Sequence, residues 1–120
     1  MAENGVNERL FQYLKKIIYE PEKAVLDRRD LPEEVQPLAE GLDVLLQFVL
    51  EERRFGKELS EGHICEVQVP SRENVLASPL KAVYGMLKHL VWLMGEVAGG
   101  DYKQRLSAAN DLSEAFNRMI

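Results

Sequence analysis

The sequence has 120 residues, enough for one domain or for two very small helical units stacked end to end. Its net charge of −5, without any sizeable basic block, argues against nucleic-acid binding, which depends on clustered lysines and arginines. A single cysteine excludes an internal disulfide framework, and the N-terminus lacks the features of a signal peptide, so we expect a cytoplasmic chain with no direct membrane span.

The first predicted helix covers residues 7–19, and Pro21 ends it because a proline disfavours helical geometry in the residue before it. Asp30 and Glu33 have the spacing of a capping box that opens a short turn. Residues 1–36 are therefore predicted to form an N-terminal helix and a capping segment. The helix has one apolar stripe, made of Leu10, Phe11, Leu14, Ile17 and Ile18.

The second predicted helix runs from about Pro37 to about Ser60, because a proline is tolerated only in the first turn of a helix. Gly62 is expected to end it in the left-handed conformation, which glycine adopts without steric cost. Its apolar residues have heptad spacing at first, but Glu52 and Gly56 then stand at the next two positions of the pattern and interrupt it. The apolar residues of the pattern are Leu38, Leu42, Leu45, Val49 and Leu59.

Residues 63–72 are predicted to be an extended connector, and the third helix that follows has the clearest pattern in the chain. Its apolar residues alternate steps of four and three without a break, which indicates a coiled-coil or bundle seam. A neighbouring stripe of Tyr84, Val91 and Ala98 favours a bundle of more than two helices. The seam, which a fourth helix continues after a second connector, consists of Leu76, Leu80, Val83, Leu87, Leu90, Met94, Val97, Leu112, Phe116 and Met119.

The chain contains an internal repeat of helix, glycine stop, connector and helix. The segment after Gly62 parallels the segment after Gly100, and Asn74-Val75-Leu76 parallels Asn110-Asp111-Leu112. The third helix ends one unit and opens the next. A unit of this kind cannot bury its apolar face alone, so we predict pairing with an identical chain in a four-helix bundle. The apolar pattern is still in progress at Ile120, from which we expect the sequence to be part of a longer protein.

The second unit resembles a HAMP domain, the linker module of bacterial receptors, histidine kinases and diguanylate cyclases. Gly100–Leu106 resembles the HAMP connector and Ala115–Met119 its second helix, although Asn110-Asp111 stands where the family has Asp-Glu. Pro37 is placed like the proline that opens a HAMP first helix. Further segments are similar to the N-terminal regions of multidomain bacterial sensors: Leu10–Leu14, Ile18–Pro21, Lys88–Trp92, Val97–Tyr102 and Ser113–Asn117.

The resemblance implies an all-α, homodimeric bundle with a degenerate first HAMP-like unit at 37–98 and a second at 86–120. It also implies a non-catalytic module of a two-component sensor or cyclase, which relays a conformational change to a C-terminal output domain of the same chain. No cofactor or metal is expected. The alternative is a monomeric phosphotransfer or adaptor protein that uses His89.

Chemical candidates are few in this sequence. The residues after His89, Leu90-Val91-Trp92, match neither a kinase phosphoacceptor helix nor a phosphotransfer domain, so a solvated or packing histidine is favoured. His63 and Cys65 lack the second pair of ligands that a structural metal site needs. Gly85, Trp92 and Gly95 form a surface that either receives the first helix, the favoured interpretation, or receives an external partner.

Overall fold

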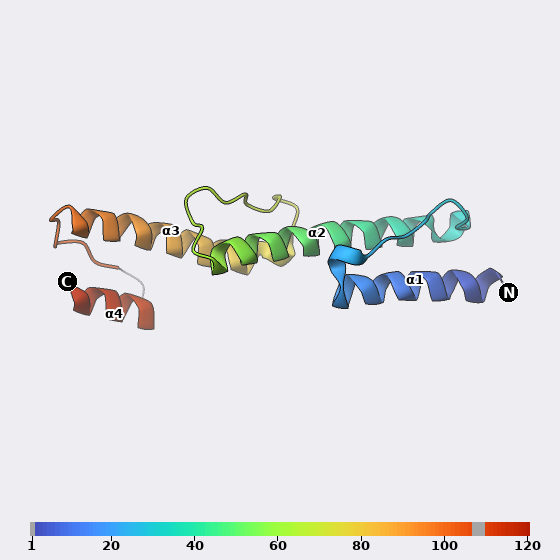
Figure 1. The fold of residues 1–120 in the computed structure, drawn as a ribbon, viewed down its shortest axis with the longest axis horizontal. Coiled ribbons are helices and arrows are strands. Elements are labelled where there is room, and N and C mark those ends of the chain that lie inside the picture. Colours follow the sequence, from blue (N-terminus) through green and yellow to red (C-terminus); the bar gives the residue numbers. More distant parts are fainter. Residues whose placement is uncertain (1, 107–109) are drawn as a thin grey trace. The chain divides into compact units, whose positions relative to one another are not determined.

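A computed structural model describes residues 2–106 and 110–120, and within them the chain contains only helices, turns and irregular connections (Figure 1). The all-α fold class is therefore confirmed. Four α-helices are present in this part of the chain: α1 (Ala2–Tyr19), α2 (Gln36–Ser60), α3 (Ser78–Ala98) and α4 (Asp111–Met119). Short 3-10 turns precede or follow them, namely η1 (Pro21–Lys23), η2 (Glu33–Val35) and η3 (Val75–Ala77). None of the described helices is long and apolar enough to cross a membrane.

The chain divides into two compact units, an N-terminal unit at Met1–Leu80 and a C-terminal unit at Lys81–Ile120. Helix α3 begins in the first and continues into the second. The predicted N-terminal segment, residues 1–36, shares its compact unit with α2. The predicted boundaries of the HAMP-like units stay a prediction.

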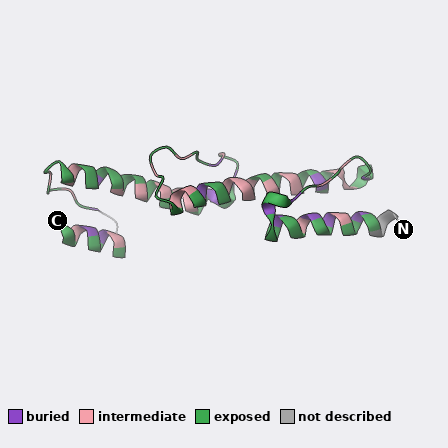
Figure 2. Cartoon of the chain, viewed as in Figure 1, coloured by how far each residue is buried: buried purple, intermediate pink, exposed green. Residues whose placement is uncertain are grey.

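In the N-terminal unit α1 and α2 run in the same direction (Figure 1). Near the start of α1, Val6 and Leu10 pack with Ala39 and its half-buried neighbours. Further along α1, Tyr13 and Ile17 pack with later residues of α2, which are Leu42, Leu45, Leu46 and Val49. The buried residues of α1 step by four, three and four, so they share one face of the helix (Figure 2). This heptad stripe fixes the register of the pair.

Three hydrogen-bonded polar side chains join the connector between α1 and α2 to both helices. The phenol of Tyr13 donates to Asp43 Oδ1 at 2.6 Å, while Arg28 Nη1 in the connector donates to Asp43 Oδ2 at 3.0 Å. Burial and the hydrogen bond to Asp43 raise the pKa of the Tyr13 phenol well above its usual range, so it remains a donor.

The capping box predicted from Asp30 and Glu33 is wrong. Pro32 is the residue that precedes the short turn η2, and no side chain caps that turn. The turn is a single 3-10 turn that leads directly into α2, so the backbone supplies its hydrogen bonds. Pro37 lies in the first turn of α2, as predicted.

The second connector returns along α2 and starts the next helix beside it. Asn74 Nδ2 donates to the carbonyl of Phe48 at 2.9 Å, and six residues later Leu80 contacts α2 beside Gly56. Since both chain segments advance together, the start of α3 runs parallel to α2 (Figure 1). Within the N-terminal unit, α2, its returning connector and the first residues of α3 thus follow one another as α1, its connector and α2 do.

The C-terminal unit repeats this arrangement with α3, a connector and α4 (Figure 1). Leu93 of α3, Leu106 of the connector and Phe116 of α4 are its buried core. The side-chain amide of Asn117 holds the connector through both backbone groups of Leu106, accepting from its N–H at 2.8 Å and donating to its carbonyl at 3.0 Å. The pair α3–α4 is therefore closed by its own connector.

Candidate functional site

The seam predicted on α3 is only partly covered in a single chain. Leu76, Val83 and Met94 are exposed, and Met119 of α4 is exposed as well. Phe116 is buried, and the remaining seam residues are half-buried, namely Leu80, Leu87, Leu90, Val97 and Leu112. The face of α3 that carries the heptad pattern is thus a partly exposed apolar surface, on which another helix could pack.

The residue that α3 buries most completely lies one position before Met94. Leu93 is 1% exposed, whereas Met94 is 50% exposed. Adjacent residues of an α-helix point about 100° apart, so the two belong to different faces. The heptad pattern missed Leu93, although its spacing from Leu90 and Val97, three and four residues, would have revealed a second stripe.

The neighbouring stripe of Tyr84, Val91 and Ala98 is not covered within a single chain, and its part in a larger bundle stays a prediction. Val91 is an exposed large apolar side chain, Ala98 is exposed, and Tyr84 is half-buried. The intramolecular stripe lies on the other flank of the seam, at Leu93, because the connector and α4 pack there.

Helix α1 shows the same division into two apolar faces. Leu10, Tyr13 and Ile17 are buried against α2. The residues that follow each of them are Phe11, Leu14 and Ile18; Phe11 and Ile18 are exposed and Leu14 is half-buried. Two stripes about 100° apart are the pattern of a helix that contacts neighbours on two adjacent sides, as in a four-helix bundle.

The two predicted glycine stops have the same local structure. Gly62 has φ of 82° and Gly100 has φ of 103°, so the expected left-handed conformation is confirmed at both. After α2, the N–H of Gly62 bonds to Leu59 O at 3.0 Å and that of the next residue to Glu58 O at 2.9 Å.

After α3, Gly100 N–H bonds to Val97 O at 2.9 Å and Asp101 N–H to Glu96 O at 3.0 Å. Both ends are therefore Schellman caps, in which the left-handed residue lets the chain leave the helix and turn back.

His89 is exposed on α3, and its ring stacks on Trp92 with centroids 6.1 Å apart and planes 11° apart. Trp92 is itself 53% exposed, and a Cβ added at Gly85 or Gly95 would meet nothing within 4 Å among the described residues. The favoured expectation, that the first helix packs here, and the alternative of an external partner both stay predictions.

His63 lies at the end of α2 beside two carboxylates. Its Nδ1 is 2.7 Å from Glu58 Oε2 and 3.7 Å from Glu61 Oε2, so three ligand-type atoms come within 4.8 Å of one another. Cys65, the other residue considered as a ligand, is exposed and does not belong to this group. The more direct interpretation is a hydrogen bond between His63 and Glu58, which also fixes the residue after the glycine cap.

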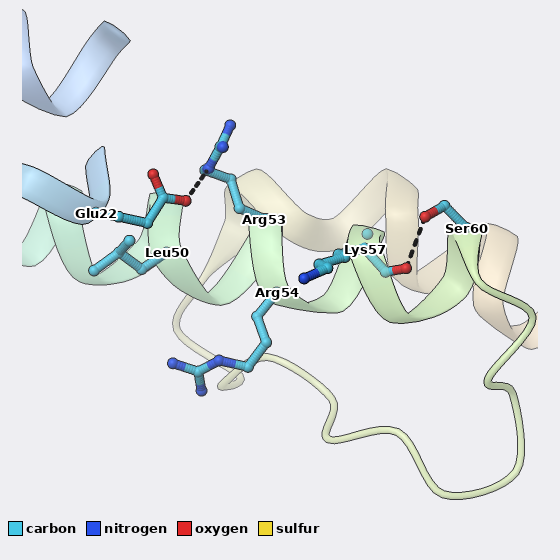
Figure 3. Close-up of a pocket in the computed structure, with 7 residues that line it drawn as sticks. Glu22, Leu50, Arg53, Arg54, Lys57 and Ser60 are labelled. Atoms are coloured by element: carbon cyan, nitrogen blue, oxygen red, sulfur yellow. Dashed lines mark hydrogen bonds and ion pairs between the residues drawn. The ribbon is translucent and has the colours of Figure 1, made fainter. Parts of the chain in front are cut away.

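An open groove of about 580 Å³ lies along the second half of α2 (Figure 3). Three cations border it, Arg53, Arg54 and Lys57, a composition that could attract an anion. However, Arg53 is engaged by Glu22 at 2.7 Å, and Figure 3 shows Arg53 and Arg54 pointing to opposite sides of the helix. The cations do not converge on one ligand position.

Comparison with known proteins adds no assignment, since the chain matches no protein-family model, no curated protein and no solved structure.

Proposed function

We propose that this chain is a non-catalytic relay module, which passes a conformational change lengthwise through a homodimeric helical bundle. The observation that carries the proposal is the repeated arrangement of parallel helices. Two helix pairs, α1–α2 and α3–α4, are each joined by a returning connector, and the connector after α2 packs on that helix through Asn74 and Leu80 before it continues into α3. Because α2 packs on α1 and also on the connector that opens α3, a shift of α2 would be passed on, which favours transmission along the chain.

Pairing with a second copy is supported by the uncovered apolar stripes. In each unit the intramolecular core uses one face of the helix, while the adjacent face keeps side chains such as Phe11, Val83 and Met94 exposed. An identical chain carries the same stripes, so a two-fold arrangement would complete a four-helix layer from two parallel pairs.

The proposed mechanism is a bistable bundle. Two packings that differ by a few kcal/mol are both accessible, and a bias applied at one end shifts the population at the other. The interrupted seam at Glu52 and Gly56 weakens the preference for one packing of α2. The output is proposed to be a kinase or cyclase domain that follows in the parent chain, as the HAMP resemblance implies.

Dimerisation is tested by sedimentation equilibrium of the wild-type chain and of Leu87→Ala, a half-buried seam residue of α3. We expect a dimer that the substitution weakens, because a truncated interface side chain leaves a cavity. A wild type that remains monomeric at high concentration would remove the basis of the proposal.

The relay itself is tested in the full-length protein with Gly100→Ala, at temperatures where the fold is intact. A left-handed alanine is strained, so the cap of α3 should move and output activity should change. A variant that is folded, dimeric and unchanged in output would argue against relay through α3.

A further inference from the structure

Asn74 and Asn110 occupy equivalent places in the repeat, each just before the second helix of its pair. Asn110 caps its helix: its Oδ1 accepts from Ser113 N–H at 2.9 Å, and α4 begins at the very next residue. Asn74 does not cap α3, and the turn η3 stands between it and the helix. The same residue type therefore has two different arrangements in one chain.

Asn74 is fully buried, and its side-chain amide is hydrogen-bonded to α2. Nδ2 donates to Phe48 O at 2.9 Å and to Glu51 Oε1 at 3.0 Å, while Oδ1 has no hydrogen-bond partner among the described residues. Exchanging the amide oxygen and nitrogen would place Oδ1 against two acceptors, so the orientation is fixed. A buried acceptor without a partner costs free energy, so an arrangement that gives Oδ1 a donor would be favoured.

The start of α3 differs from that of α4 accordingly. Ser78 N–H bonds to Val75 O, three residues back, as in a 3-10 turn. At the equivalent place in the other repeat, Glu114 N–H bonds to Asn110 O, four residues back, as in an α-helix. A capped α3 would follow the second pattern, with Ser78 N–H bonded to the carbonyl of Asn74.

We propose that Asn74 is a two-position switch, which either clips the connector to α2 or caps α3. In the clipped position, seen here, it donates to α2 and η3 is a 3-10 turn. In the capping position Oδ1 would accept from the first turn of α3, and residues 75–77 would become α-helical. This inference rests on the proposed relay for its biological meaning, because it names the element that would have two states.

The two positions differ in the phase of the helix that leaves them. A 3-10 helix turns about 120° per residue and an α-helix about 100°, so three converted residues change the phase by about 60°. The rise per residue changes from about 2.0 to about 1.5 Å, which shortens this segment by roughly 1.5 Å. Helix α3 is continuous from Ser78 to Ala98, so the change would be passed to its whole length.

Glu51 is the residue that holds the clipped position. One of its carboxylate oxygens accepts from Asn74 Nδ2 and from Ser71 Oγ at 3.0 Å. Weakening this acceptor should release Asn74 toward the capping position, and a carboxylate at position 74 should be repelled by Glu51 while still able to cap.

The test compares three variants by NMR, using the coupling across hydrogen bonds to identify the acceptor of Ser78 N–H. Asn74→Asp can cap but cannot donate, and we expect the acceptor to change from the carbonyl of Val75 to that of residue 74. Asn74→Ala, the matched control, can do neither and should keep the Val75 acceptor. An Asn74→Asp variant that keeps the Val75 acceptor, or an Asn74→Ala variant that loses it, would overturn the proposal.

Glu51→Gln provides a test that does not depend on the folding of Asn74→Asp. We expect Ser78 N–H to be shared between both acceptors, and exchange of the Asn74 side-chain amide protons to rise about tenfold, since a hydrogen bond to a charged acceptor is replaced by a neutral one. Wild-type exchange together with an unshared Val75 acceptor would contradict the switch. The relay is measured separately, by output activity of the full-length protein, so either idea can fail without the other.

Discussion

Leu93 and Met94 are adjacent on α3 and are predicted to respond oppositely to truncation. Leu93 is 1% exposed and packs with Leu106 and Phe116, so Leu93→Ala removes a side chain from the centre of the C-terminal unit. Substitutions of this kind cost about 2–5 kcal/mol, depending on how far the site can collapse. Among the described residues the cluster has three buried members, with half-buried neighbours that can relax inward. We therefore expect the lower part of the range, about 2–3 kcal/mol.

Met94→Ala is the matched control, because its side chain is half exposed and lies outside that cluster. It should cost little within one chain but should weaken self-association if the seam is the dimer interface. Trp92, the single tryptophan, lies on the same helix and reports unfolding by its fluorescence in urea. Measurements at several protein concentrations separate the two effects, since dimer stability depends on concentration.

Two results would refute this reasoning. If Leu93→Ala costs less than about 1 kcal/mol, the core of the C-terminal unit is not where we place it. If Met94→Ala alters stability equally at all concentrations, the exposed seam does not serve association. A marginally stable chain, with about 5–15 kcal/mol in total, makes both effects measurable.

Three further predictions concern the glycines, His89 and Glu51. Gly62→Ala and Gly100→Ala should each lower the free energy of unfolding by about 1–2 kcal/mol, because both φ angles are positive. Gly95→Ala, in open space within α3, should instead raise the melting temperature measured by circular dichroism, and a lower melting temperature would reveal a helix packed on that surface. His89 should acquire no phosphoryl group from acetyl phosphate, and an acid-labile mass increase that vanishes in His89→Ala would promote the phosphotransfer alternative. Burial alone would raise the pKa of Glu51, but hydrogen bonds from Asn74, Ser71 and Gln47 outweigh it and hold the pKa below its ordinary value of 4.5. Glu51 therefore contributes stability above pH 4.5 that is lost as the pH falls through its lower folded pKa, and Glu51→Gln should lack this part of the acid dependence in urea titrations.

The features predicted correctly from the sequence are those that depend on neighbouring residues along the chain. The end of α1 before Pro21, the extent of α2 and the left-handed glycines follow from backbone sterics within a few residues. The all-α class follows from a pattern repeated over many turns, which leaves no strand periodicity to compete with it.

The features missed depend on which partner each face meets. A heptad pattern shows that α3 has an apolar face, but Leu93 and Met94 are both apolar, and only the position of α4 decides which of them is buried. The pairing of α1 with α2 was likewise not predicted, because periodicity carries no information on the neighbour. The capping box at Asp30 failed because the turn it would have opened is a 3-10 turn that the backbone bonds already close.

Helix α2 packs on α1 and also on the next connector, which restricts where its sequence can gain or lose residues. Its residues Ala39, Leu42, Leu45, Leu46 and Val49 pack with α1, whereas Glu51 and Gly56 contact the next connector and the start of α3. One residue inserted after Val49 would turn one of these sites about 100° away from its partner, whereas insertions of about seven or eleven residues, which complete nearly whole turns, would keep both aligned. The connectors are not helical, so added residues there do not rotate the sites on α2. Natural length variation is therefore expected in the connectors, while α2 should change only by nearly whole turns.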